Sequence, residues 1–191
     1  MKKLFYFIFV FLLITVILFF SGYRFTARTA AEAHSLLNKG SKLVQIVKSN
    51  FGEVYIYKTN DYYLTIIPEK KGFLWLAPYS ISTKDINDKN DSVRTIGWAS
   101  SSGPYILGTV LVVEVQDDNV AYIEAGPAIE RVKKKVEKGK YIVFEWDKAY
   151  NSHNINPIAL SQDGTQLYMY GYDPATPNYL DQKELRWHKI Q

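Results

Sequence analysis

The sequence predicts a mainly β protein with an N-terminal transmembrane helix, a short stalk helix, and then an antiparallel β-sandwich or partly open barrel. Residues 4–20 predict the first part, because they form one apolar run without a charged residue. Beyond residue 41, short runs rich in Tyr, Ile, Val and Trp, residue types that favour strands, recur between turn signals. Such runs, at a spacing of about 8–12 residues, are typical of sandwiches and barrels.

The apolar run LFYFIFVFLLITVILFF, residues 4–20, favours a membrane anchor. As a helix with a rise of about 1.5 Å per residue it spans roughly 25 Å, close to the hydrocarbon thickness of a bilayer. A cleaved signal peptide is the alternative, with a small-residue cleavage site close behind its apolar region. The nearest such pattern, Ala31-Glu32-Ala33, lies more than ten residues beyond Phe20. An uncleaved anchor is therefore the favoured interpretation.

Positive charges near the ends of the run predict the orientation of the chain. Lys2 and Lys3 precede it, whereas Arg24 and Arg28 follow it, so the bias is slight and places the N-terminus inside. The expected protein is a single-pass protein of the cell membrane that contacts the lipid bilayer through residues 4–22. The expected segments are a cytoplasmic tail (1–3), the anchor (4–22), the stalk helix (23–40) and an extracytoplasmic β domain (41–191).

Composition restricts the function further. The chain has no cysteine, which excludes disulfides, thiol nucleophiles and iron–sulfur clusters. The formal net charge is +4, and without Lys2 and Lys3 the remaining 21 basic residues nearly balance 19 acidic ones. A nearly neutral exterior without a recognisable recognition fold argues against nucleic acid as a partner. No motif calls for a cofactor.

The stalk helix is predicted over residues 29–39. Thr29 and Glu32 have the spacing of a capping box, in which each side chain accepts from a free backbone N–H at the start of a helix. Gly40 has the residue type that commonly follows the last turn.

Period-two patterning between turn residues predicts the strands of the domain. We expect strands at 42–48, 53–58, 62–67, 72–76, 93–100, 105–115, 120–124, 141–146, 157–161, 166–172 and 184–188. Pro68 is expected to end the third of these strands. The longest apolar run, 105–115, predicts a central strand covered on both faces. The polar segment 85–91 is interpreted as a solvated loop rather than a calcium site, because Lys89 interrupts its oxygen-bearing side chains.

Residues 128–138 are ambiguous between helix and strand. Ile129, Val132 and Val136 have helical spacing, which slightly favours a helix although strands flank the segment. The segment is also the most basic stretch outside the anchor. Candidate contacts with an anionic surface are Arg131, Lys133, Lys134, Lys135 and Lys138. The competing interpretation is an ordinary solvated face.

A second candidate surface is aromatic. Tyr168, Tyr170 and Tyr172 alternate along one predicted strand and therefore share a face. If exposed, this face is the best aromatic contact surface in the chain, although most aromatic residues of a β domain lie in its core.

The sequence contains no catalytic motif, and its three histidines do not have metal-binding spacing. We therefore expect no catalytic and no metal-binding residues. The favoured function is a non-catalytic, membrane-anchored envelope protein whose β domain binds another protein or a cell-wall component, such as an anionic wall polymer. The alternative is an extracytoplasmic hydrolase that uses a pair of carboxylates from among Glu114, Glu124 and Glu145.

Overall fold

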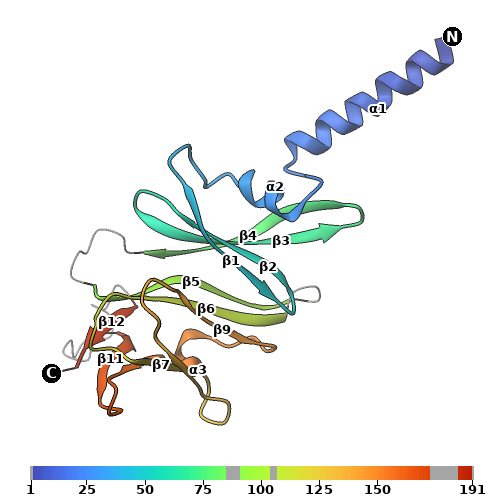
Figure 1. Ribbon diagram of the computed structural model, residues 1–191. Helices are drawn as coiled ribbons and strands as arrows, with labels where there is room; N and C mark the ends of the chain where they lie inside the picture. The colour runs from blue at the N-terminus through green and yellow to red at the C-terminus, as the bar shows by residue number, and fades with distance from the viewer. Residues whose placement is uncertain (1, 85–90, 104–106, 173–184, 191) are drawn as a thin grey trace.

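The computed structural model describes residues 2–84, 91–103, 107–172 and 185–190. The expectation of a mainly β protein is confirmed, since these residues form twelve strands in three antiparallel sheets after one long apolar helix (Figure 1). The segment 85–90, which holds most of the loop weighed as a calcium site, lies outside the described residues.

Helix α1 spans Lys2–Phe20 and stands clear of the sheets (Figure 1). None of its residues is buried, although its mean hydropathy reaches 2.7. A helix of this length and composition can cross a membrane, and both an anchor and a signal sequence have these properties.

Helix α2 spans Ala27–Glu32, so the stalk helix predicted at 29–39 begins too late and is too long. Thr26, rather than Thr29, is the N-cap: its hydroxyl oxygen accepts from the N–H of Thr29 at 3.1 Å. The helix ends before Gly40 can cap it, at Ala33, and the chain then turns at His34. The short helix is held by packing, because Ala27 and Ala31 are buried against the neighbouring sheet.

The sheet next to α2, here called the proximal sheet, has the order β1-β2-β3-β4. Its strands are β1 (Lys42–Ser49), β2 (Gly52–Lys58), β3 (Tyr62–Lys71) and β4 (Leu74–Lys84). The predicted hairpin around Gly52 is present, but Pro68 does not end β3. The register between β3 and β4 shifts between Ile67 and Glu69. Such an irregularity accommodates a residue that lacks an N–H, so both strands run further than predicted.

The middle sheet has the order β5-β6-β9. Its strands are β5 (Val93–Ser102), β6 (Leu107–Val115) and β9 (Ile142–Trp146). The prediction that β6 is central and covered on both faces is confirmed. Leu111 and Val113 belong to one hydrophobic cluster, whereas Val110 and Val112 belong to another, and all four are fully buried. A period of two places these pairs on opposite faces.

The distal sheet has the order β12-β11-β10-β7-β8. Its strands are β7 (Tyr122–Ala125), β8 (Val132–Lys135), β10 (Ile158–Leu160), β11 (Gln166–Gly171) and β12 (Arg186–Lys189). Between β9 and β10 the short helix α3 (Ser152–Ile155), which the sequence did not predict, buries Ile155 in the core.

The slight preference for a helix at 128–138 is wrong, because this segment contains β8. Gly126 adopts a φ of 123° and donates its N–H to the carbonyl of Ile155 at 2.7 Å, which reverses the chain after β7. β8 then pairs with β7 from Val132 to Lys135. Of the three residues with helical spacing, only Val136 packs against the core, since Ile129 is 89% exposed and Val132 is 37% exposed.

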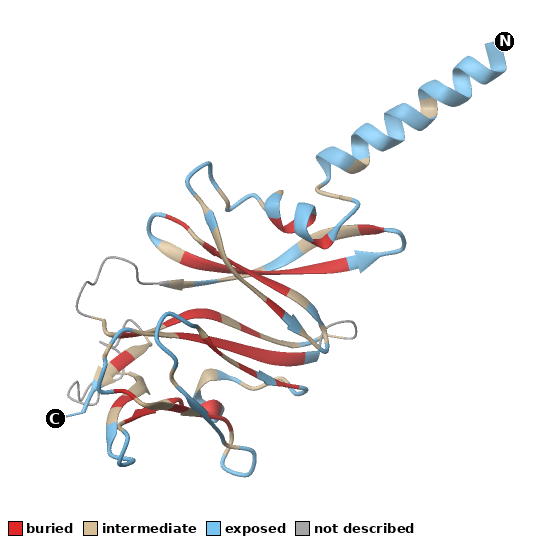
Figure 2. Ribbon diagram, viewed as in Figure 1, coloured by how far each residue is buried: buried red, intermediate tan, exposed pale blue. Residues whose placement is uncertain are grey.

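The order of layers is therefore α2, proximal sheet, middle sheet and distal sheet (Figure 1). One hydrophobic cluster joins the proximal and middle sheets and another joins the middle and distal sheets. Figure 2 shows the buried residues on the strands inside this stack and the exposed surface of α1. The stack places the distal sheet farthest from α1.

Candidate functional site

The structure separates the basic residues that the sequence grouped together. The Arg131 side chain forms hydrogen bonds within the domain. Its Nε donates to Glu124 Oε1, and its Nη1 donates to the carbonyls of Gly126 and Asn156 at 3.1 and 3.2 Å. These bonds brace the turn between β7 and β8. The guanidinium is therefore occupied by internal acceptors.

Two further members of the basic group also have partners. Lys138 lies 3.1 Å from the carboxylate of Asp118, in an exposed ion pair. Lys134 Nζ donates to the carbonyl of Val143 at 2.6 Å and lies 5.3 Å from the Phe144 ring centroid. Lys134 thus points from β8 toward β9 of the middle sheet.

Lys133 and Lys135 remain as a pair on the other side of β8. They are two residues apart on a strand whose four residues are all exposed. Lys133 Nζ lies 4.3 Å from the Tyr122 ring centroid. Neither lysine forms an ion pair with another of the described residues. This lysine pair stands at the free edge of the distal sheet, where lysines also discourage pairing with another strand.

The tyrosine face is turned largely toward the core. Tyr168 is only 7% exposed and donates its hydroxyl to Asp117 Oδ2 at 2.7 Å. Tyr170 packs with its ring centroid 5.7 Å from that of Trp187, and burial raises the pKa of its phenol. Tyr172 is half-buried and lies 5.9 Å from the His153 ring. The aromatic contact was predicted only for an exposed face, and Tyr168 does not fulfil this condition.

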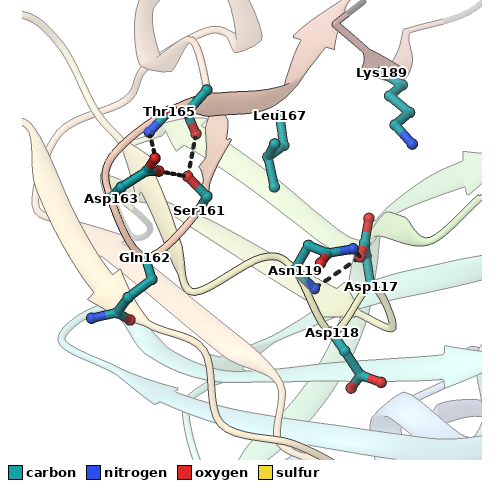
Figure 3. A pocket seen from close by; sticks show the side chains of 9 residues that line it. All are labelled: Asp117, Asp118, Asn119, Ser161, Gln162, Asp163, Thr165, Leu167 and Lys189. Carbon is teal, nitrogen blue, oxygen red and sulfur yellow. Dashed lines mark hydrogen bonds between the residues drawn. The ribbon is translucent and has the colours of Figure 1, made fainter.

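The turn between β6 and β7 forms a wall of two surface cavities that the sequence did not predict. The larger, of about 750 Å3, is drawn in Figure 3. It is lined by Asp117, Asp118, Asn119, Ser161, Gln162, Asp163, Thr165, Leu167 and Lys189. The smaller, of about 500 Å3, shares Asp117 and Asp118 and extends to Glu114, Lys138, Lys140 and Tyr141.

Two carboxylates of the larger cavity, Asp117 and Asp163, accept hydrogen bonds from backbone N–H groups of their own turns (Figure 3). Hydrogen bonds from the Tyr168 hydroxyl and the Asn119 backbone N–H hold the pKa of Asp117 below its usual value. Bonds from Ser161 and Thr165 lower the pKa of Asp163 in the same way. Both groups are ionised at neutral pH, so neither is poised as a general acid. All the side chains that line this cavity except Leu167 are polar or charged.

The structure places the carboxylates named for a hydrolase on three different strands, with Glu114 on β6, Glu124 on β7 and Glu145 on β9. Glu124 is bound to Arg131 in the distal sheet. Glu145 pairs with Val110, which is four residues from Glu114 along β6. Four residues of strand span roughly 13 Å, more than the separation of about 5–9.5 Å between carboxyl groups at which glycoside hydrolases act. Among the described residues no group of three His, Cys, Asp or Glu side chains could hold a metal ion.

Comparisons of this chain with protein-family models, with curated proteins and with solved structures found no match. The fold therefore gives only a structural class: a mainly β chain of three antiparallel sheets with one long apolar helix at its N-terminus.

Proposed function

We propose that this protein is a single-pass membrane protein whose β domain lies outside the cell membrane and binds an anionic wall polymer through Lys133 and Lys135. It acts as a tethered binding protein and not as an enzyme. The observation that carries the proposal is the exposed pair Lys133 and Lys135, which forms no ion pair with the described residues and lies in the layer farthest from α1.

The anchor is supported by the surface of α1. Its apolar side chains are exposed along the whole helix, which water disfavours and lipid favours. Arg24 supports a membrane–water interface at the C-terminal end of α1, where basic residues are expected. Its Nη1 donates to the carbonyl of Phe19 at 2.7 Å, and its guanidinium lies 4.0 Å from the Phe19 ring centroid. The slight bias of positive charge supports an N-terminus inside.

The order of layers supports a partner other than the anchoring bilayer. Packed sheets lie about 10 Å apart, so the distal sheet is displaced by roughly 20 Å from the proximal sheet. This exceeds the Debye length of about 8–10 Å at physiological ionic strength. Lys133 and Lys135 would therefore gain little from the head groups around α1, whereas a polymer that extends away from the membrane can reach them.

We also propose that the three layers form two β-sandwiches that share the middle sheet. The support is β6, whose alternating residues enter two separate hydrophobic clusters. A shared strand of this kind connects binding residues of the distal sheet rigidly to the anchor.

The anchor and its orientation can be tested in whole cells. We expect the full chain to stay in the membrane fraction after alkaline carbonate washing, and external protease to digest the β domain once the wall is removed. A chain in which Leu12 and Ile14 are both changed to Arg should be lost from the membrane, because each charge at the centre of a span costs about 2.5–3.5 kcal/mol. A protected domain, or a mature N-terminus near Ala33, would contradict the proposal.

The polymer contact can be tested with the full chain in nanodiscs of uncharged lipid. The double change Lys133→Gln and Lys135→Gln is expected to weaken binding to purified anionic wall polymer by about tenfold or more, since each base near a charged surface contributes on the order of 1 kcal/mol. The difference should shrink as salt is raised.

The matched control is Lys42→Gln with Lys48→Gln, which removes the same charge from exposed positions of β1 at the edge of the proximal sheet. It should leave polymer binding nearly unchanged. Equal losses for both pairs would indicate a response to net charge alone, and the assignment to β8 would then be wrong.

A further inference from the structure

The β3–β4 hairpin ends in an exposed tip at the side of the domain that α1 joins (Figure 1). Lys70 pairs with Trp75 and Lys71 with Leu74, which leaves Gly72 and Phe73 to form the turn. The Phe73 side chain is 77% exposed. A phenylalanine of this exposure is not needed for the core of the domain.

The tip is fastened to the segment that follows α1. Arg24 and Trp75 form an isolated antiparallel bridge, in which each backbone N–H donates to the carbonyl of the other at 2.8 and 2.7 Å. Two residues before Arg24, the chain passes so close to β4 that a Cβ on Gly22 would lie 3.2 Å from Leu76 Cδ1. The position of the hairpin relative to the end of α1 is thus fixed by hydrogen bonds and by packing.

A second exposed phenylalanine lies in the same region. Phe25 is 77% exposed and directly follows Arg24, the residue bridged to Trp75. Phe20, at the end of α1, is 84% exposed. Three exposed phenylalanines thus lie at the end of α1, beside Arg24 in the chain, and two residues from its bridge partner Trp75, although single exposed aromatic residues are ordinary on a soluble surface.

The side chains around these rings have the composition of a membrane interface. Lys70 is exposed, and its Nζ lies 5.9 Å from the Trp75 ring centroid. Lys71 is also exposed and forms an ion pair with Glu69 at 2.7 Å. Tryptophan beside basic residues is enriched at the level of lipid head groups, where the ring is apolar and its edge is hydrated.

We propose that the β3–β4 tip and Phe25 form a second membrane contact, which dips into the head-group layer of the bilayer that holds α1. This inference rests on the proposed anchoring by α1 and adds a fixed orientation of the domain to it. Phe73 and Phe25 enter the interface, and Lys70 contacts anionic lipid. The occupant is the bilayer rather than a protein, because the surface is continuous with the exit of a helix that is apolar on every side.

The contact can be tested with the unlabelled full chain in vesicles of phosphatidylcholine and phosphatidylglycerol with brominated acyl chains, which quench tryptophan at close range. Trp75 reports on the tip, because the remaining three tryptophans lie in the middle and distal sheets. We expect quenching in the wild-type chain and a reduction of about twofold or more in Phe73→Ser, since serine removes the apolar area of a ring that is 77% exposed. The matched control is Ile129→Ser, which changes a residue that is 89% exposed beside β8 and should leave quenching unchanged.

Flotation of the same vesicles separates the two proposals. A chain that floats with the vesicles but shows no quenching, or equal quenching in wild type and Phe73→Ser, would overturn the membrane contact and leave the anchor in place. A chain that does not float would overturn the anchor, and with it the contact.

Discussion

Raising the pH from about 9 to about 12 is expected to remove a large part of the stability of the β domain. Burial in the proximal sheet raises the pKa of Tyr57 and of Tyr63 to about 12. Burial, together with a hydrogen bond to Glu53, raises the pKa of Tyr55 as well. All three side chains are at most 4% exposed.

The direction of the effect follows from linkage. The phenols have a pKa of about 10 in the unfolded chain, so the folded state holds their protons more tightly. Their contribution is fully present below about pH 10 and is lost as the pH rises through about 12. A rise in pKa from about 10 to about 12 corresponds to roughly 3 kcal/mol for each phenol, so Tyr57 and Tyr63 together contribute on the order of 5 kcal/mol. This is comparable with the net stability of a domain, about 5–15 kcal/mol.

Tyr57→Phe separates this mechanism from general alkaline damage. The Tyr57 hydroxyl is buried and has no hydrogen-bond partner in the described part of the chain. Its removal should therefore be neutral or stabilising by about 1 kcal/mol at neutral pH, and should raise the pH at which the domain unfolds. Tyr79→Phe, at a side chain that is 55% exposed, is the control and should change neither quantity. Equilibrium denaturation from about pH 8 to 12 measures both, and a constant stability over this range would contradict the prediction.

Phe144→Ala is expected to destabilise the domain by about 3–5 kcal/mol. Phe144 is 1% exposed in the cluster between the middle and distal sheets, and its ring stacks on that of Trp146 with centroids 5.8 Å apart. Alanine removes the burial of the ring and leaves a cavity that well-packed neighbours fill only in part. Lys134 would also lose the ring beneath its ammonium group.

Denaturant unfolding of the full chain in detergent, followed by tryptophan fluorescence, measures this loss. Ile129→Ala is the control, because truncation of a side chain that is 89% exposed and lies outside the proposed membrane contact should change stability by no more than about 0.5 kcal/mol. Equal losses in the two variants would show that Phe144 does not connect the middle and distal sheets as described.

Features encoded in a short stretch of sequence were predicted correctly. The apolar run gave a single long helix, since apolar side chains over 17 residues need no distant partner to be recognised. The turn at Gly52 and the strands on either side of it were found because glycine and a period of two are local signals. The burial of β6 on both faces followed from its nearly continuous apolar sequence.

Errors arose where pairing or packing with another segment outweighs a weak local pattern. Ile129 and Val132 have helical spacing, but the segment forms β8 because its backbone pairs with β7. Pro68 was tolerated because the register of β3 against β4 shifts beside it. The helix cap moved to Thr26 because Ala27 and Ala31 had to face the proximal sheet. Only the partners of α2, in β2 and β3, lie beyond the window that a local pattern covers, whereas β7 with β8 and β3 with β4 are consecutive strands.

The sequence by itself determined a β-rich chain with one apolar helix at its N-terminus, since hydrophobicity and its period are properties of neighbouring residues. The tertiary structure alone decided which charges stay available. Arg131 and Glu124, or Lys138 and Asp118, meet only through strand pairing and turn geometry. The first pair withdraws Arg131 from the predicted surface, whereas Lys138 stays 89% exposed. Lys133 and Lys135 remain because the two-residue period of a strand turns both of them away from the side on which Lys134 contacts β9.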